Sequence, residues 1–105
     1  MAFSGHIPRK RFGQHWLKDT SVLDKIVWAA DLKSDDRVLE VGPGRGALTE
    51  RLLESKASAV HSIELDRDLV RGLRTRFSGE SRFTLQEGDV LSAPLNPSED
   101  FPITK

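Results

Sequence analysis

The sequence predicts an α/β fold in which helices flank a parallel sheet, and two observations support this class. Short apolar runs typical of buried strands alternate with segments whose apolar residues recur every three or four positions, as they do in helices. Such alternation is the signature of βαβ units, whose neighbouring strands run parallel. A length of 105 residues provides for one small domain.

Helices are predicted before and between the strands. Asp19 or Thr20 is expected to cap the first helix, the second begins at Gly46, and the third follows the second strand with a row of arginines turned to solvent. The apolar positions expected to face the core from these helices are Val22, Leu23, Ile26, Val27, Ala30, Leu48, Leu52, Leu53, Leu69, Val70, Leu73 and Phe77.

The expected strands span residues 37–41, 59–63 and 83–86, and residues 101–104 begin a fourth. Parallel sheets are normally covered on both faces and have all their neighbouring strands. Three strands and the start of a fourth therefore indicate half of a doubly wound sheet. We expect the outer edge of the first strand to favour self-association of this chain.

Composition excludes several kinds of site. The chain has no cysteine, so disulfides, a thiolate nucleophile and a cysteine-based zinc site are excluded. Its three histidines are far apart in sequence, and we expect no metal centre. No apolar run approaches the roughly 20 residues of a membrane span, and a secretory signal is not visible. A cytoplasmic protein is expected, with an organelle as the alternative.

The net charge is zero, but the charges are unevenly distributed. Residues 1–18 hold four basic residues and no acidic one, so they form a basic arm. The remainder carries 16 acidic against 12 basic residues, which leaves it with a charge of −4. A basic arm on an acidic body favours contact between the N-terminal segment and a polyanion.

A glycine-rich turn, Glu-Val-Gly-Pro-Gly-Arg-Gly-Ala at residues 40–47, lies between a strand and a helix. Glycines permit a tight bend and the close approach of a ligand, and α/β sheets bind ligands at this end of their strands. Gly42, Gly44 and Ala47 fit a dinucleotide pattern, so NAD is one candidate. Glu40 favours S-adenosylmethionine, because a carboxylate there would repel a pyrophosphate but suits a sulfonium.

Acidic residues follow the next two strands. Glu64 lies 22 residues after Gly42, where a carboxylate can accept hydrogen bonds from both ribose hydroxyls of either cofactor. Asp89 is placed to accept from the exocyclic amine of an adenine, with Leu65 and Val90 against the two faces of the ring. A dinucleotide enzyme needs no acid at this second place, so the full series favours S-adenosylmethionine.

The segment at residues 9–19, Arg-Lys-Arg-Phe-Gly-Gln-His-Trp-Leu-Lys-Asp, resembles the opening motif of the ribosomal RNA adenine N6,N6-dimethyltransferases. This is the kasugamycin-sensitivity family, whose relatives include erythromycin-resistance methyltransferases and mitochondrial transcription factor B. The likeness continues at residues 38–49, 63–68 and 87–91, in the right order and spacing.

The resemblance implies a partial Rossmann-like class I methyltransferase fold, to which the family adds a small helical domain. It implies an S-adenosylmethionine-dependent enzyme that places two methyl groups on N6 of each of two adjacent adenines near the 3′ end of small-subunit rRNA. Residues 1–18 would be a basic arm with a motif that closes over the cofactor. Residues 19–105 would be the N-terminal half of the cofactor-binding domain.

Carried over position by position, the resemblance assigns contacts with the cofactor. His15 and Leu17 close over it, glycines lie under its methionine part, and acids hold its ribose and adenine. His15 stands where the family often has Asn, and both side chains can form hydrogen bonds. The implied cofactor-binding residues, with the two apolar neighbours of the adenine, are His15, Leu17, Gly42, Gly44, Glu64, Leu65, Asp89 and Val90.

The catalytic motif of the family, Asn followed by Leu or Ile, Pro and an aromatic residue, does not occur in the 105 residues. We therefore predict no catalytic residue in this chain, and expect the chain alone to bind cofactor weakly without turnover. Arg9, Lys10 and Arg11 are expected to contact phosphates of the partner rRNA.

Three other functions stay open on the sequence. The first is a different class I methyltransferase, against which the motif at residues 9–19 argues. The second is a non-catalytic RNA-binding or transcription-factor relative, and the third is an NAD-dependent oxidoreductase. We expect the full-length family protein to be a monomer.

Overall fold

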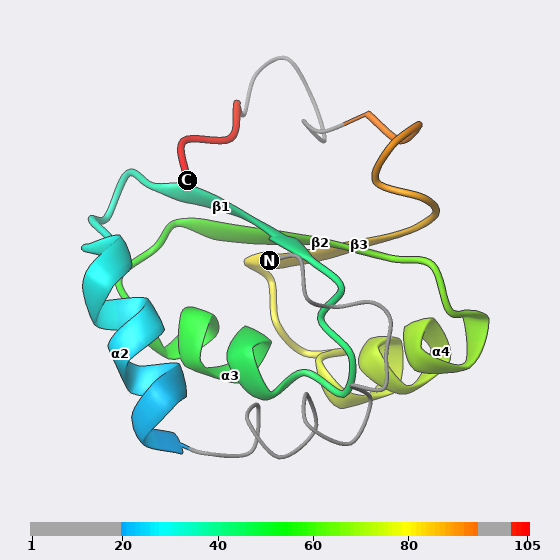
Figure 1. The fold of residues 1–105 in the computed structure, drawn as a ribbon, viewed down its shortest axis with the longest axis horizontal. Helices are drawn as coiled ribbons and strands as arrows, with labels where there is room; N and C mark the ends of the chain where they lie inside the picture. Colours follow the sequence, from blue (N-terminus) through cyan, green and yellow to red (C-terminus); the bar gives the residue numbers. More distant parts are fainter. Residues whose placement is uncertain (1–19, 95–101) are drawn as a thin grey trace.

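A computed structural model of the chain describes residues 20–94 and 102–105. In chain order its elements are α2 (Thr20–Ala30), β1 (Arg37–Val41), α3 (Ala47–Glu54), β2 (Ala59–Glu64), α4 (Arg67–Arg76) and β3 (Phe83–Glu87), as Figure 1 shows. Within these described ranges, no helix combines the length and apolar character that crossing a membrane requires. The predicted order of the three helices and of the first three strands is confirmed.

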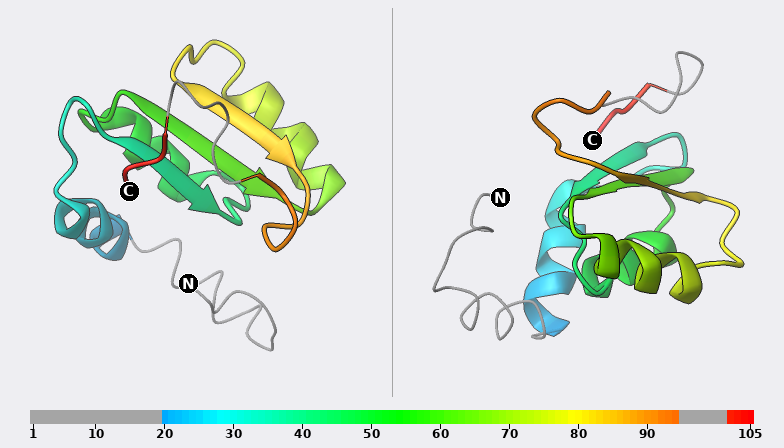
Figure 2. Two further views of the ribbon diagram at one scale, coloured as in Figure 1. Left: turned by 90° about the horizontal axis from the view of Figure 1, so that it is seen from above. Right: turned by 90° about the vertical axis from the view of Figure 1, so that its right-hand side faces the viewer.

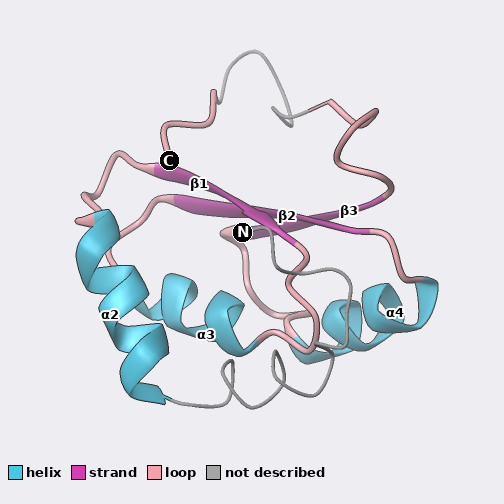
Figure 3. Cartoon of the chain, viewed as in Figure 1, coloured by secondary structure: helices cyan, strands magenta, loops and turns pink. Residues whose placement is uncertain are grey.

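The described strands form one parallel sheet in the order β1-β2-β3 (Figure 3). Val41, the last residue of β1, pairs with Ile63, and Glu64, the last residue of β2, pairs with Glu87 of β3. The carboxyl ends of the strands therefore meet at one edge of the sheet, which confirms the predicted α/β class with a parallel sheet.

Helices α3 and α4 lie against one face of the sheet, and α2 packs beside α3 (Figure 2). The core between these layers includes Leu52, Leu53, Leu73 and Phe77, which helical periodicity predicted, and Val60 and Leu73 are each only 1% exposed. Its buried members are Val38, Leu52, Leu53, Ala57, Val60, Leu73 and Phe77. This core fixes both helices against the strands whose ends carry the predicted site residues.

Side chains form hydrogen bonds at one end of each of the two helices nearest the site, the start of α4 and the end of α3. The Asp66 carboxylate accepts from the backbone N–H groups of Asp68 at 2.8 Å and Leu69 at 3.2 Å, so it caps the start of α4. Arg82 donates to the carbonyl oxygens of Leu53, Ser55 and Ala57, where α3 ends. Both contacts satisfy backbone groups that a helix leaves unpaired at its termini.

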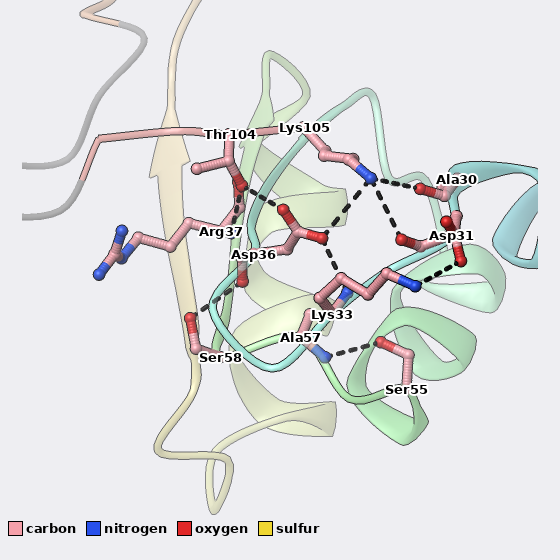
Figure 4. A network of polar contacts seen from close by, with 10 residues as sticks. All are labelled: Ala30, Asp31, Lys33, Asp36, Arg37, Ser55, Ala57, Ser58, Thr104 and Lys105. Atoms are coloured by element: carbon pink, nitrogen blue, oxygen red, sulfur yellow. Dashed lines mark hydrogen bonds and ion pairs between the residues drawn. The ribbon is translucent and has the colours of Figure 1, made fainter.

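A polar network ties residues 102–105 to the start of β1 (Figure 4). The Asp36 carboxylate accepts from the Lys33 backbone N–H at 2.8 Å and from the Thr104 hydroxyl at 2.8 Å, and lies 3.6 Å from Lys105 Nζ. The same hydroxyl accepts from the Arg37 N–H at 2.8 Å. Segments almost 70 residues apart in sequence are thereby joined.

The predicted fourth strand at residues 101–104 is wrong for the part that the structure describes, because residues 102–105 form no strand. The backbone N–H groups of Thr104 and Lys105 both donate to the Arg37 carbonyl, at 2.8 Å and 3.2 Å. A ladder needs a new partner at every second residue, and here the hydroxyl of Thr104 takes the Arg37 N–H. The segment nevertheless lies at the outer edge of β1, where the fourth strand was expected.

Replacing Thr104 with Val should raise the pKa of Asp36. The Lys33 N–H and then the Thr104 hydroxyl lower this pKa below its ordinary value of 3.8. A carboxyl with a lowered folded pKa contributes stability above its unfolded value, and loses it as pH falls through the folded one. The cost of Thr104→Val, measured by urea unfolding, should therefore be larger at pH 6 than below pH 3.

Thr75→Val is the control, because within residues 20–94 and 102–105 the Thr75 hydroxyl has one hydrogen-bond partner, the helix carbonyl of Arg71. Its cost should not change between these pH values. An equal cost of Thr104→Val at both would contradict the role given to Asp36.

Candidate functional site

Backbone hydrogen bonds align the turns that follow the strands. The Gly42 N–H donates to the Ile63 carbonyl at 2.9 Å, and the Gly88 N–H donates to the Glu64 carbonyl at 2.9 Å. Each bond extends the parallel pairing one residue past the end of a strand. The turn at residues 42–46 and the residues after β2 and β3 therefore lie along one edge of the sheet.

The glycine turn has a shape that other residues rarely adopt. Gly42 and Gly44 have φ of 69° and 60°, in the left-handed region, and a hydrogen bond of 2.9 Å from the Gly46 N–H to the Pro43 carbonyl closes the bend. Among the described residues, apart from each glycine and its two chain neighbours, no heavy atom lies within 4 Å of the position that a Cβ on Gly42 or Gly44 would take. The backbone is therefore open to close approach by a ligand.

Gly46 serves a different purpose from its two neighbours. Its φ is 95°, and a Cβ there would lie only 2.7 Å from Cε2 of Phe77. This third glycine lets the start of α3 pack against the end of α4, rather than leaving room for a ligand.

Glu64 connects the glycine turn with the turn after β2. The residue is 8% exposed; one carboxylate oxygen accepts from the Gly44 N–H at 3.2 Å and the other from the Asp66 N–H at 3.0 Å. A carboxylate has about four acceptor positions, so both oxygens keep capacity for a further donor. Leu65, the next residue, is 68% exposed. The structure thus brings Gly44 and Glu64 into contact, with Leu65 exposed beside them, and their roles toward a cofactor stay predictions.

Asp89 lies in the turn after β3, at the same edge. Its side chain is exposed and accepts from the Leu91 N–H at 2.9 Å, while its carbonyl accepts from the N–H groups of Ser92 and Ala93. Val90 is half-buried within this turn. Asp89 therefore neighbours the other predicted residues along the sheet edge, although no hydrogen bond between it and Glu64 is present in the described part.

Glu40, two residues before Gly42, links β1 to α3 and to β2. Its carboxylate is buried and accepts from the hydroxyls of Thr49 at 2.6 Å and Ser62 at 2.8 Å. Burial raises the pKa of Glu40; the two hydroxyl donors oppose this effect, and the nearby Glu64 adds to it. The sequence predicted an acid beside the glycines but not its two partners.

The pairing of β1 with β2 accounts for one of these two hydroxyl partners, because Ser62 lies directly opposite Glu40 in the sheet. Thr49 reaches the same carboxylate from the first turns of α3. Neither contact follows from a local sequence pattern, because both depend on how the helix and the second strand pack on the first.

The other predicted site residues, His15, Leu17, Arg9, Lys10 and Arg11, lie outside the described residues, so their roles stay predictions. Within residues 20–94 and 102–105, the structure contains no group of three His, Asp or Glu side chains placed to share a metal ion.

Comparison with known sequences gives close relatives. Residues 5–100 match the profile of the family described as ribosomal RNA adenine dimethylase. The chain is 63% identical over all its 105 residues to the ribosomal RNA small subunit methyltransferase A of Prochlorococcus marinus, and 73% identical over 96 residues to that of a Synechococcus strain. It spans 38% and 35% of the lengths of these two proteins.

Solved structures of RNA methyltransferases are also similar to this chain. A dimethyladenosine transferase from Plasmodium falciparum superposes with a TM-score of 0.65 at 37% identity, over 70% of this chain and 27% of that one. The 23S rRNA methyltransferase ErmE superposes with a TM-score of 0.69 at 36% identity, over 76% of this chain and 32% of that one. Both likenesses confirm a Rossmann-like class I methyltransferase fold.

Glu40→Gln should alter how stability depends on pH. A glutamine keeps an oxygen that accepts from Thr49 and Ser62 but removes the buried charge. Because the folded pKa of Glu40 lies above its ordinary value of 4.5, wild-type stability from this group is present below that value and is lost as pH rises through the folded pKa. The variant should gain stability relative to wild type over this range, as measured by urea unfolding.

Glu54→Gln, at an exposed position near the end of α3, is the matched control and should show no such gain. A stability difference for Glu40→Gln that stays constant from pH 4 to pH 8 would contradict the buried charge.

Proposed function

The chain belongs to the ribosomal RNA adenine dimethylase family, and from this premise we propose that it is the S-adenosylmethionine-binding part of an rRNA adenine N6,N6-dimethyltransferase. Under this proposal the substrate is small-subunit rRNA, in which two adjacent adenines near the 3′ end each receive two methyl groups. One observation carries the proposal: an open glycine turn with Glu64 bonded to it, at the edge where Asp89 also lies.

The residues present fit this cofactor better than a dinucleotide. Gly42 and Gly44 leave open backbone, over which the methionine part would lie. Glu40 and Glu64 give the surroundings of the turn negative character, which favours a cationic group and opposes a pyrophosphate. When bound, S-adenosylmethionine supplies an electrophilic methyl group on a positively charged sulfur.

The adenosine part would be held by the turns after β2 and β3. Glu64 would accept from the ribose hydroxyls with the acceptor positions that Gly44 and Asp66 leave unused. Asp89 would accept from the adenine amine, with Leu65 and Val90 against the ring. His15 and Leu17, in the proposed arm at residues 1–18, would close over the cofactor that residues 19–105 hold.

The chain's own residues contribute binding and orientation in this function. Transfer of a methyl group requires the acceptor nitrogen to be aligned with the methyl, so a rigid site has catalytic value. An enzyme that modifies a base in a paired region must also take that base out of its stack. Arg9, Lys10 and Arg11 would hold the RNA backbone near the site through phosphate contacts.

The remaining expectations are part of the same proposal. We place the protein in the cytoplasm, since its bacterial relatives are named for ribosomal RNA. The full-length protein would be a monomer that needs no metal. The 105-residue chain would self-associate through the part of the outer edge of β1 that follows Arg37, since Thr104 and Lys105 bond to Arg37 itself. A monomer at high concentration on size-exclusion chromatography would reject this last point.

Calorimetry with S-adenosylmethionine and with NAD tests the cofactor. We expect binding of the first and none of the second, and Asp89→Ala should weaken binding by about tenfold, as expected for loss of a hydrogen bond to a charged group. Glu87→Ala, an exposed acid two residues away, is the control and should leave affinity unchanged. Tight NAD binding without binding of S-adenosylmethionine would reject the proposal, and full affinity of Asp89→Ala would reject the adenine contact.

Replacing Arg9, Lys10 and Arg11 together with Ala should weaken RNA binding and lower its salt dependence. Loss of three phosphate contacts reduces the slope of log affinity against log salt by about two to three. The control removes three exposed basic side chains elsewhere, through Lys25→Ala, Lys56→Ala and Arg74→Ala. Equal affinities and slopes for the two triple variants would eliminate the RNA role of the arm.

A further inference from the structure

The guanidinium of Arg76, the last residue of α4, reaches the glycine turn, and we propose that Arg76 is a positioning residue that holds this turn in its cofactor-binding shape. Its Nη1 donates to the Arg45 carbonyl at 2.6 Å. The inference rests on the proposed function, since it concerns the same cofactor.

Two further contacts fix the guanidinium in place. Its Nη2 lies 3.3 Å from a carboxylate oxygen of Glu50, in the first turn of α3, and its Cζ lies 5.0 Å from the ring centroid of Phe77. The planar fork of an arginine suits this arrangement, because separate nitrogens can donate to separate acceptors while the flat face rests on an aromatic ring. Arg76 thus joins the glycine turn, the start of α3 and the end of α4.

The shape of the turn depends on this contact. A Cβ at residue 46 would lie 3.1 Å from Arg76 Nη1 and 2.7 Å from Phe77 Cε2, so Gly46 packs directly against the end of α4. The residue before Arg45, Gly44, donates its N–H to Glu64. Consecutive residues of the turn are therefore held by groups of opposite charge, a carboxylate at Gly44 and a guanidinium at Arg45.

Such a clamp matters because glycine has more backbone freedom than any other residue. An unrestrained turn with three glycines would populate other conformations. Ordering it on binding would cost conformational entropy and so lower the affinity for the ligand. Arg76 would raise affinity for the cofactor without touching it. Its loss should therefore raise the KM for the methyl donor and leave kcat unchanged.

A role in overall folding is a weaker explanation for Arg76. Its side chain is 40% exposed, whereas α4 is held to the sheet by the buried residues Val70 and Leu73. Arg74, on the same helix, is exposed, and its side chain forms no hydrogen bond or ion pair within the described part of the chain. Arg74 therefore provides a matched control for the removal of one arginine.

The test uses the full-length protein and three variants of it: Arg76→Gln, Arg76→Lys and the control Arg74→Gln. Three quantities are measured: the Kd for S-adenosylmethionine by calorimetry, KM and kcat for methyl transfer, and hydrogen exchange of the backbone amides of residues 44–47 without cofactor. We expect Arg76→Gln to raise Kd and KM by about five- to tenfold, the range for a partly exposed charged hydrogen bond, and to speed exchange in the turn. Arg76→Lys should restore part of the affinity, and Arg74→Gln should resemble wild type.

Unchanged exchange in the turn of Arg76→Gln would overturn the clamp. Faster amide exchange in the turn with an unchanged Kd for S-adenosylmethionine would contradict the proposed contribution of Arg76 to cofactor binding. If Arg76→Gln fails to fold, Arg76→Lys and Glu50→Gln decide the matter, and wild-type Kd values in both would overturn the proposal. Wild-type protein that binds no S-adenosylmethionine would reject the proposed function and the clamp's role in it, whereas hydrogen exchange would still report whether Arg76 orders the turn.

Discussion

The carboxylate of Glu64 joins the two turns on which the candidate site depends. It accepts from Gly44 in the glycine turn and from Asp66 at the start of α4, while the Glu64 carbonyl accepts from Gly88 after β3. One residue at the end of the central strand thereby bonds to the turns on both sides of it. The parallel register makes this possible, because it brings all three carboxyl ends to one edge.

Negative charge near this edge is costly to the fold. Glu40 is buried, its hydrogen-bond partners among the described residues are two neutral hydroxyls, and burial raises its pKa. A residue selected for stability alone would carry no charge there, since burial disfavours the ionised form. Proteins break such rules most often at functional sites. The cost of Glu40 therefore agrees with a site built to receive a cation, as the sulfonium of the proposed cofactor is.

Much of the fold and part of the site could be predicted from the sequence. Periodicity located the core residues of α3 and α4, and the acid that ends β2 was placed at the sheet edge, because local patterns determine both. The hydroxyl partners of Glu40 and the contact of Arg76 with the glycine turn could not be predicted, since they depend on how distant segments pack. The fourth strand was predicted from a short apolar run, but side-chain bonds of Thr104 replace its first backbone pairs.

The central claim is that the three strand ends form one adenosine-binding edge, and titration of ¹⁵N-labelled protein with S-adenosylmethionine tests it most directly. Amide shifts in the described part of the chain should change at residues 42–46, 64–66 and 88–91, and remain unchanged in the outward-facing residues of α2 and around Asp36. Shift changes centred on another part of the sheet, or saturation of binding with no change at Gly42, Glu64 and Asp89, would contradict the claim.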